Sequence, residues 1–478
     1  MIEALALAAV ASVLFVALSP APRVVSRALV VTCAWVTMVP LHGATSTALA
    51  IGLITMILVL AYALMYRHRH GSGMLLVCLA ASTLLLELLY GFIADQVGPI
   101  RTLATVAMLL TLVLCTGIRR PDLLHLANGL ALLLVLHVGY AVGELFAGLP
   151  GIWPMTDGSN DISTRVNAIL PQLAGRPMTS FSHPIPFAFF LLLASTVAMA
   201  CAVEFKKPLY WAVPALGLFG IIMSGTRSVV IAFAVVTAMV VLFSYRRHVI
   251  GKIVVTITAT TTCAFVGLDR LREALGLGGG FDATASYRHR TAVVNSFPSL
   301  FGHDLRHVLL GWGADAHYIF DQGIVGRSST SFYFFDNQYV ATMAEVGFLG
   351  LLLLVLALCG AFVVGDPHSR ALVVAFAVAA TGFDALDHLP GVLAFIMAAG
   401  FAAAAMRRRT VREHAAASAG SEHGSSQDID GEAGDEDAGP GAALPVSRTA
   451  SERSEELTAF FAAQHERAGA ETYPRDER

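Results

Sequence analysis

The stretch FFDNQYVATMAEVGFLGLLLLVLALCGAFVV, Phe334–Val364, decides the fold. It carries Asp336, Asn337 and Gln338 near its start and no charge after Glu345. The 27 residues from Gln338 to Val364 are long enough to cross a bilayer, which takes about 20 residues. The segment before it, from Leu268 onward, is the largest polar piece of the chain ahead of the C-terminal tail. The pattern predicts a large external loop that returns to the membrane at Phe334, and we expect the chemistry in that loop.

The rest of the chain is apolar beyond the level of a soluble protein. Hydrophobic residues make up 56% of the 478 residues and charged residues only 14%, too few to cover a soluble surface. Recurring apolar runs predict an all-α integral membrane protein, a polytopic bundle of about 12–13 transmembrane helices with one large external loop. The expected spans are Ile2–Leu18, Val24–Val39, Ser46–Tyr66, Met74–Ala94, Ile100–Ile118, Leu123–Phe146, Pro184–Val203, Leu209–Met223, Ser228–Phe243, Val249–Gly267, Gln338–Val364, Leu372–Leu386 and Val392–Met406.

The basic residues between the spans set the expected orientation. Pairs such as Arg119–Arg120 and Lys206–Lys207, with Arg407–Arg409 at the end, all fall on one face, which we assign to the cytoplasm. The N-terminus is then outside and the C-terminal tail inside. The expected parts are N-terminal helices (1–148), an external loop (149–183), central helices (184–267), the large external loop (268–337), C-terminal helices (338–406) and a disordered acidic tail (407–478).

Several classes of chemistry are excluded by missing motifs. No phosphate-binding loop and no dinucleotide fingerprint appears, which argues against ATP-driven transport by this chain. The six cysteines all lie inside apolar runs and form no CxxC pair, so neither a metal nor another cofactor is expected. The net charge of −3 gives no indication of a nucleic-acid partner.

Three arginines fall on the predicted outer face, where the distribution of basic loops does not explain them. Arg227 stands between two apolar runs in IIMSGTRSVVIAF, and Arg288 and Arg290 form a second basic cluster in ASYRHRTAV. Guanidinium groups that converge from different segments suit a diphosphate, because each offers a planar fork to phosphate oxygens. Alternatively, Arg227 lies at the membrane interface and extends its side chain into water. The alternative for Arg288 and Arg290 is that they lie in a solvated loop.

A carboxylate and an amide stand where the external loop re-enters the membrane. Asp336 could act as a general base, because apolar surroundings can raise the pKa of a carboxyl group toward neutrality. The alternative is that Asp336 and Asn337 cap the helix that follows. Glu345 lies about two turns further along that helix.

The order of these motifs resembles that of the O-antigen ligase-like superfamily of bacterial envelope polymerases and ligases. The segments are GRPMTSFSHPIPFAFFLLL, SGTRS, SYRHR, GWGADA and DNQYVATMAEVGFLGLLL, between Gly175 and Val364. The resemblance implies a glycosyltransferase of the GT-C type in the bacterial plasma membrane. It implies an undecaprenyl-diphosphate-linked glycan as donor and a glycan or lipid as acceptor on the outer face.

The resemblance also assigns residues. Arg227 and Arg288 match arginines of the family, and Asp336–Asn337 falls on its HN pair, with Asp in place of the usual His. These four are the expected catalytic residues. The expected substrate contacts are Arg176, Arg290, His317, which is a substitute base, and Glu345, which with Gly347 matches the family's E-x-G.

Two other functions remain open from the sequence. A transporter or flippase would move a lipid-linked substrate without forming a bond, although such proteins often carry internal repeats and none is seen here. A non-catalytic envelope scaffold would recruit assembly partners through the acidic tail.

Overall fold

The computed structural model describes residues 2–41, 44–66, 74–93, 98–153, 167, 169–170, 173, 175–244, 285–313, 315–327 and 333–424. These residues form helices and no strand. The α-helices are α1 (Ile2–Ala17), α2 (Val24–Met38), α3 (Ser46–Leu64), α4 (Met74–Ile93), α5 (Pro99–Cys115), α6 (Arg120–Phe146), α8 (Pro184–Glu204), α9 (Ala212–Ser224), α10 (Arg227–Ser244), α13 (Ala285–Asn295), α14 (Leu305–Leu310), α15 (Ala316–Asp321), α16 (Gln338–Val364), α17 (Pro367–Ala379) and α18 (Leu389–Gly424). The 3-10 helices are η1 (Ala21–Arg23), η2 (Pro208–Trp211), η5 (Pro298–Gly302) and η6 (Ala385–Asp387).

Five of the described helices are long and apolar enough to cross a membrane: α3, α6, α8, α16 and α18 as far as Val411. Several shorter apolar helices accompany them. Each expected span coincides with a described helix except Val249–Gly267, which lies outside the described residues. The prediction of a polytopic all-α membrane protein is therefore confirmed.

The chain divides into two units, Met1–Ala415 and Ala416–Arg478, and every site residue discussed below belongs to the first. In that unit α8 and the first part of α18 are almost entirely buried. Helix α8 packs against α6, α9, α10 and α17, and Ala, Phe and Leu side chains fill its surroundings. This buried centre holds the ends of the surrounding helices in place, including those that carry the candidate site.

Two helix boundaries differ from the expected spans. Helix α17 begins at Pro367, because Asp366 accepts a hydrogen bond from the Ser369 N–H as a cap, and it ends at Ala379 instead of Leu386. Helix α18 continues to Gly424, well past the expected end at Met406. Arginine and alanine after Met406 favour helix outside the apolar layer too. The tail from 425 onward lies outside the described residues.

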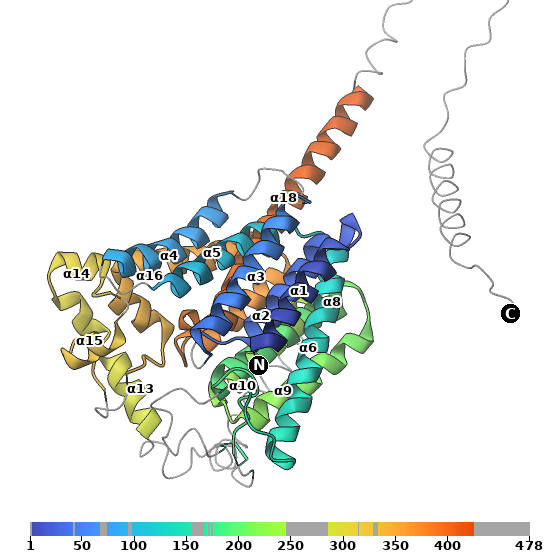
Figure 1. The fold of residues 1–478 in the computed structure, drawn as a ribbon. Helices are drawn as coiled ribbons and strands as arrows, with labels where there is room; N and C mark the ends of the chain where they lie inside the picture. The colour runs from blue at the N-terminus through green and yellow to red at the C-terminus, as the bar shows by residue number, and fades with distance from the viewer. Residues whose placement is uncertain are drawn as a thin grey trace, which may run out of the picture. The chain divides into compact units, whose positions relative to one another are not determined.

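The described part of the external loop folds around a small core of its own. Figure 1 shows α13, α14 and α15, in yellow, close to one another, and α14 packs against α16. Val293 of α13 and Phe320 of α15 pack with Phe335 and with Met343 of α16. The first part of α16 thus serves as the floor of this loop, which we call the cap (residues 285–327 and 333–336).

Glycines fix the cap to a kink in α16. Gly347 has a φ of 74°, so the helix is interrupted there, and the Ala344 and Glu345 carbonyls accept hydrogen bonds from the N–H groups of Trp312 and Gly313 at 2.8 and 3.0 Å. A Cβ at Gly311 would lie 2.4 Å from Glu345 backbone, and one at Gly347 would lie 2.4 Å from Leu309 backbone. Only glycine permits this approach.

Candidate active site

Three arginines from separate segments come close together at one end of the first unit. Arg176 donates hydrogen bonds from Nε to the Ser224 carbonyl at 2.6 Å and from Nη2 to Thr226 Oγ1 at 3.1 Å. Burial, and next the positive charges of Arg290 and Arg227, lower the pKa of Arg176 to about 10. Because like charges repel, this arrangement is unfavourable by itself and favours a bound anion.

The turn between α9 and α10 positions Arg227 beside this group. Helix α9 ends at Gly225, whose φ is 67°, and the Ser224 hydroxyl accepts a hydrogen bond from the Thr226 N–H. Helix α10 begins at Arg227 itself. A cation at a helix N-terminus adds to the positive end of the helix dipole, so both features attract an anion.

Arg290 joins the arginines to the predicted base. Its Nε donates to Oδ2 of Asp336 at 3.2 Å, and the Asp336 side chain is only 8% exposed. Asp336 has a φ of 50°, in the left-handed region that non-glycine residues rarely occupy. Such strain is found most often at functional positions. Among the described residues, Asp336 Oδ1 has no hydrogen-bonding partner.

Asn337 decides the capping alternative. Its Oδ1 accepts hydrogen bonds from the N–H groups of Tyr339 and Val340, which makes Asn337 the N-cap of α16. Its Nδ2 donates to the Thr381 carbonyl at 3.3 Å. Asp336 therefore does not cap the helix, and its side chain is directed to Arg290 instead.

The other predicted site residues lie away from these contacts. Arg288 is exposed, and since it precedes Arg290 by two positions in α13 the two side chains leave different sides of the helix. His317 is exposed and stacks on Tyr333 with ring centroids 4.0 Å apart. Glu345 lines a pocket with Arg101 of α5. Their roles remain predictions.

The segment that carries Arg176 is fastened by a glutamate that the sequence analysis did not select. Glu144, in the last turn of α6, accepts hydrogen bonds at Oε2 from the N–H groups of Met178 and Thr179 at 2.9 and 3.1 Å. Ser180 Oγ donates a hydrogen bond to the carbonyl of Thr37, which belongs to α2. These contacts hold the three residues after Pro177 against α6 and α2, and thereby limit where Arg176 can reach.

Comparison with known proteins gives a family match for part of the chain. Residues 212–355 match the family model described as O-antigen ligase. The resemblance to the O-antigen ligase-like superfamily is thereby confirmed, over a segment that contains Arg227, Arg290 and Asp336. A search of the curated proteins gives no match. The family match supports the assignment of this chain as a membrane protein of the O-antigen ligase or polymerase type. Proteins of this type act on glycans, and the match implies lipid-linked glycans among the substrates.

Arg176, an expected substrate contact, lies ahead of the residues that the family model matches, so its position beside Ser224 and Thr226 is given by the structure and not by the family match. Arg101 was also missed, although a signal was available. It is an arginine at the predicted outer end of a span, the same observation that singled out Arg227. Within the described residues, no group of three His, Cys, Asp or Glu side chains could hold a metal ion.

Proposed function

We propose that this O-antigen ligase-like protein transfers a glycan from an undecaprenyl diphosphate donor to an acceptor hydroxyl on the outer face of the bacterial plasma membrane. The observation that carries the proposal is the convergence of Arg176, Arg227 and Arg290 beside Asp336. A group of cations, one of which is paired with a buried carboxylate, matches a reaction that needs a site for an anionic leaving group and a proton acceptor together.

The arginines act on the leaving group. As the bond between the anomeric carbon and the diphosphate breaks, negative charge grows on the diphosphate oxygens. Guanidinium groups already fixed around that position stabilise the transition state more than the ground state. Arg176 is fixed by its bonds to Ser224 and Thr226, and Arg227 by its place at the start of α10.

Asp336 acts on the acceptor. Its Oδ1 takes the proton of the acceptor hydroxyl, whose oxygen forms the new bond to the anomeric carbon while undecaprenyl diphosphate departs with the electron pair. Arg290 holds Oδ2 and so fixes the direction of the carboxylate. No nucleotide takes part in this reaction, which agrees with the missing nucleotide motifs. Exposed Arg288 would then meet the donor at the rim of the site.

The test uses the full chain in lipid nanodiscs with undecaprenyl-diphosphate-linked glycan from its host, without nucleotide. Gel and mass spectrometry follow lengthening or transfer of the glycan and the release of undecaprenyl diphosphate. We expect Arg176→Ala and Arg290→Ala each to reduce the rate by at least about a hundredfold. Arg306→Ala is the matched control, since Arg306 is an exposed arginine of the same cap, in α14.

Each outcome of the assay distinguishes between possible functions. Laddering of the lipid-linked product indicates a polymerase, and a single transfer to a separate acceptor indicates a ligase. If Arg176→Ala and Arg290→Ala transfer glycan as fast as Arg306→Ala, the arginines are not part of the site. Movement of intact donor across the bilayer with no new bond would replace the proposal with transport.

A further inference from the structure

A polar pocket lies next to the segment that carries Asp336. It has a volume of about 90 Å³ and is bounded by α16, by the first turn of α5 and by the residues around η6. Its charged lining residues are Glu345, Asp384, Asp387 and Arg101. Phe334, whose ring is 41% exposed, supplies an apolar wall. The four charged side chains come from three different helical segments, so the pocket depends on the tertiary fold.

The pocket is tied to the candidate base through its neighbours in the chain. Phe334 and Phe335 precede Asp336, and Gln338 follows it, and all three line the pocket. The Gln338 side chain accepts a hydrogen bond from the Leu386 N–H at 2.5 Å and donates one to Thr342 Oγ1 at 2.9 Å. Gln338 thus fastens the wall that carries Asp384 and Asp387 at a fixed place next to Asp336.

The charge of this pocket is opposite to that of the arginine group. Three carboxylates and one guanidinium line this pocket, and the His388 ring lies 3.9 Å from Asp384. In the arginine group, three guanidinium groups lie near one another and Arg290 pairs with Asp336. A diphosphate is therefore repelled from this pocket and attracted to the other. Carboxylates accept hydrogen bonds without donating, which suits the hydroxyl groups of a sugar.

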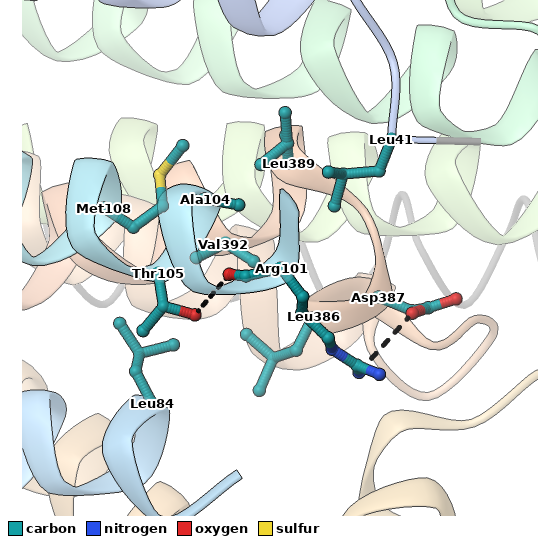
Figure 2. A pocket seen from close by; sticks show the side chains of 10 residues that line it. All are labelled: Leu41, Leu84, Arg101, Ala104, Thr105, Met108, Leu386, Asp387, Leu389 and Val392. Atoms are coloured by element: carbon teal, nitrogen blue, oxygen red, sulfur yellow. Dashed lines mark hydrogen bonds and ion pairs between the residues drawn. The ribbon is translucent and has the colours of Figure 1, made fainter. Parts of the chain in front are cut away.

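The pocket continues into an apolar one. Figure 2 shows Arg101 extending from the first turn of α5 toward Asp387, with Leu84, Met108, Leu389 and other apolar side chains around it. The nearest nitrogen and oxygen of Arg101 and Asp387 are 4.0 Å apart. Arg101, Leu386 and Asp387 line both pockets, so the ion pair marks the border between an apolar compartment and a polar one.

We propose that the polar pocket binds the terminal sugar of the acceptor, that this sugar is uncharged, and that Glu345 and Asp384 select it. The pocket is polar and large enough for ordered water, which the hydroxyl groups along one edge of a sugar ring would displace. The sugar then presents one further hydroxyl to Asp336. The proposal rests on the proposed function, because it places the acceptor relative to the same base.

The experiment pairs kinetics with direct binding, using the full chain in nanodiscs. The variants are Glu345→Gln and Asp384→Asn, which keep size and remove charge. Asp304→Asn is the control, since Asp304 is an exposed carboxylate of the cap. The binding probe is the oligosaccharide freed from the host's lipid-linked glycan by mild acid, observed by saturation-transfer NMR. We expect each pocket variant to raise the acceptor KM about tenfold with the donor KM unchanged, and to lose the sugar signal.

The outcomes separate the two proposals. If wild-type protein transfers glycan but the pocket variants keep the acceptor KM and the sugar signal of Asp304→Asn, the pocket proposal is overturned and the proposed function stands. If wild-type protein transfers nothing, yet binds the oligosaccharide and the variants do not, the pocket stands and the function fails. Tighter binding of an acidic oligosaccharide than of an uncharged one would also overturn the assignment.

Discussion

Arg290 and Asp336 form an ion pair between the first helix of the cap and the residue at which the cap meets α16, with Nε 3.2 Å from Oδ2. The arginine belongs to α13, and the carboxylate belongs to the residue just before Asn337, the N-cap residue of α16. In the proposed reaction, the pair therefore couples a residue of the arginine group, which meets the donor, to the base, which meets the acceptor. We expect neither side chain to be replaceable alone.

The first prediction concerns the base. Asp336→Asn keeps the shape of the side chain but removes its ability to accept a proton. We expect the rate of glycan transfer to fall by about 10²–10⁴, the usual contribution of a general base, with the donor KM little changed. The rate is measured by release of undecaprenyl diphosphate in nanodiscs. A variant that kept a tenth of the wild-type rate would assign the proton transfer to another group.

The second prediction concerns the arginine group without any turnover. Inorganic diphosphate, bound among Arg176, Arg227 and Arg290, offsets their repulsion, so we expect it to raise the thermal unfolding temperature. The rise should shrink in high salt, because the arginines are not fully buried. Arg176→Ala should abolish it, and Arg306→Ala should leave it intact. An equal rise in both variants would locate the anion elsewhere.

The third prediction separates capping from catalysis at Asn337. Asn337→Ala removes both hydrogen bonds to the start of α16 and should lower the free energy of unfolding by about 1 kcal/mol. Asn337→Ser restores an oxygen cap, and we expect near wild-type stability and transfer. Denaturation in nanodiscs and the transfer assay measure the two effects. Full stability with lost transfer in Asn337→Ser would mean that the amide touches substrate.

The fourth prediction concerns the contact between the cap and the kink. Gly347→Ala would put a Cβ about 2.4 Å from Leu309 backbone at a φ of 74°. The left-handed conformation costs about 1–2 kcal/mol and the overlap about 1–3 kcal/mol more, so the cap should loosen. Gly302→Ala is the control, because nothing lies within 4 Å of its Cβ position. Limited proteolysis of the cap compares them; equal protection would contradict the contact.

The membrane helices were predictable because the bilayer imposes a length and an apolar composition on each span. The same constraint made Arg227 conspicuous, since the distribution of basic loops does not explain a cation on the predicted outer face. Helix ends were less predictable. The start of α17 depends on the Asp366 cap, and the length of α18 on helix-forming residues past the apolar layer.

Within the site, the residue types were predictable and their partners were not. The sequence left Asp336 and Asn337 as equal candidates for the cap, and only the hydrogen bonds to Tyr339 and Val340 distinguish them. Glu345 was expected among the substrate contacts, but its neighbours Arg101 and Asp384 come from segments far away in the chain. Glu144 was overlooked as a support for Arg176, because its hydrogen bonds are to backbone, which leaves no trace in residue type.

The glycine contact between the cap and α16 has a mechanical consequence. With no side chain between Gly311 and Gly347, there is no soft layer in which the cap could slide on the helix. A tilt of the part of α16 before Gly347 would move α14 with it. Through the hydrogen bond between Gln338 and the Leu386 N–H, it would move the turn at Leu386 as well. When the surrounding bilayer thins or bends, Asp336 and the polar pocket should therefore move as one rigid block and keep their spacing.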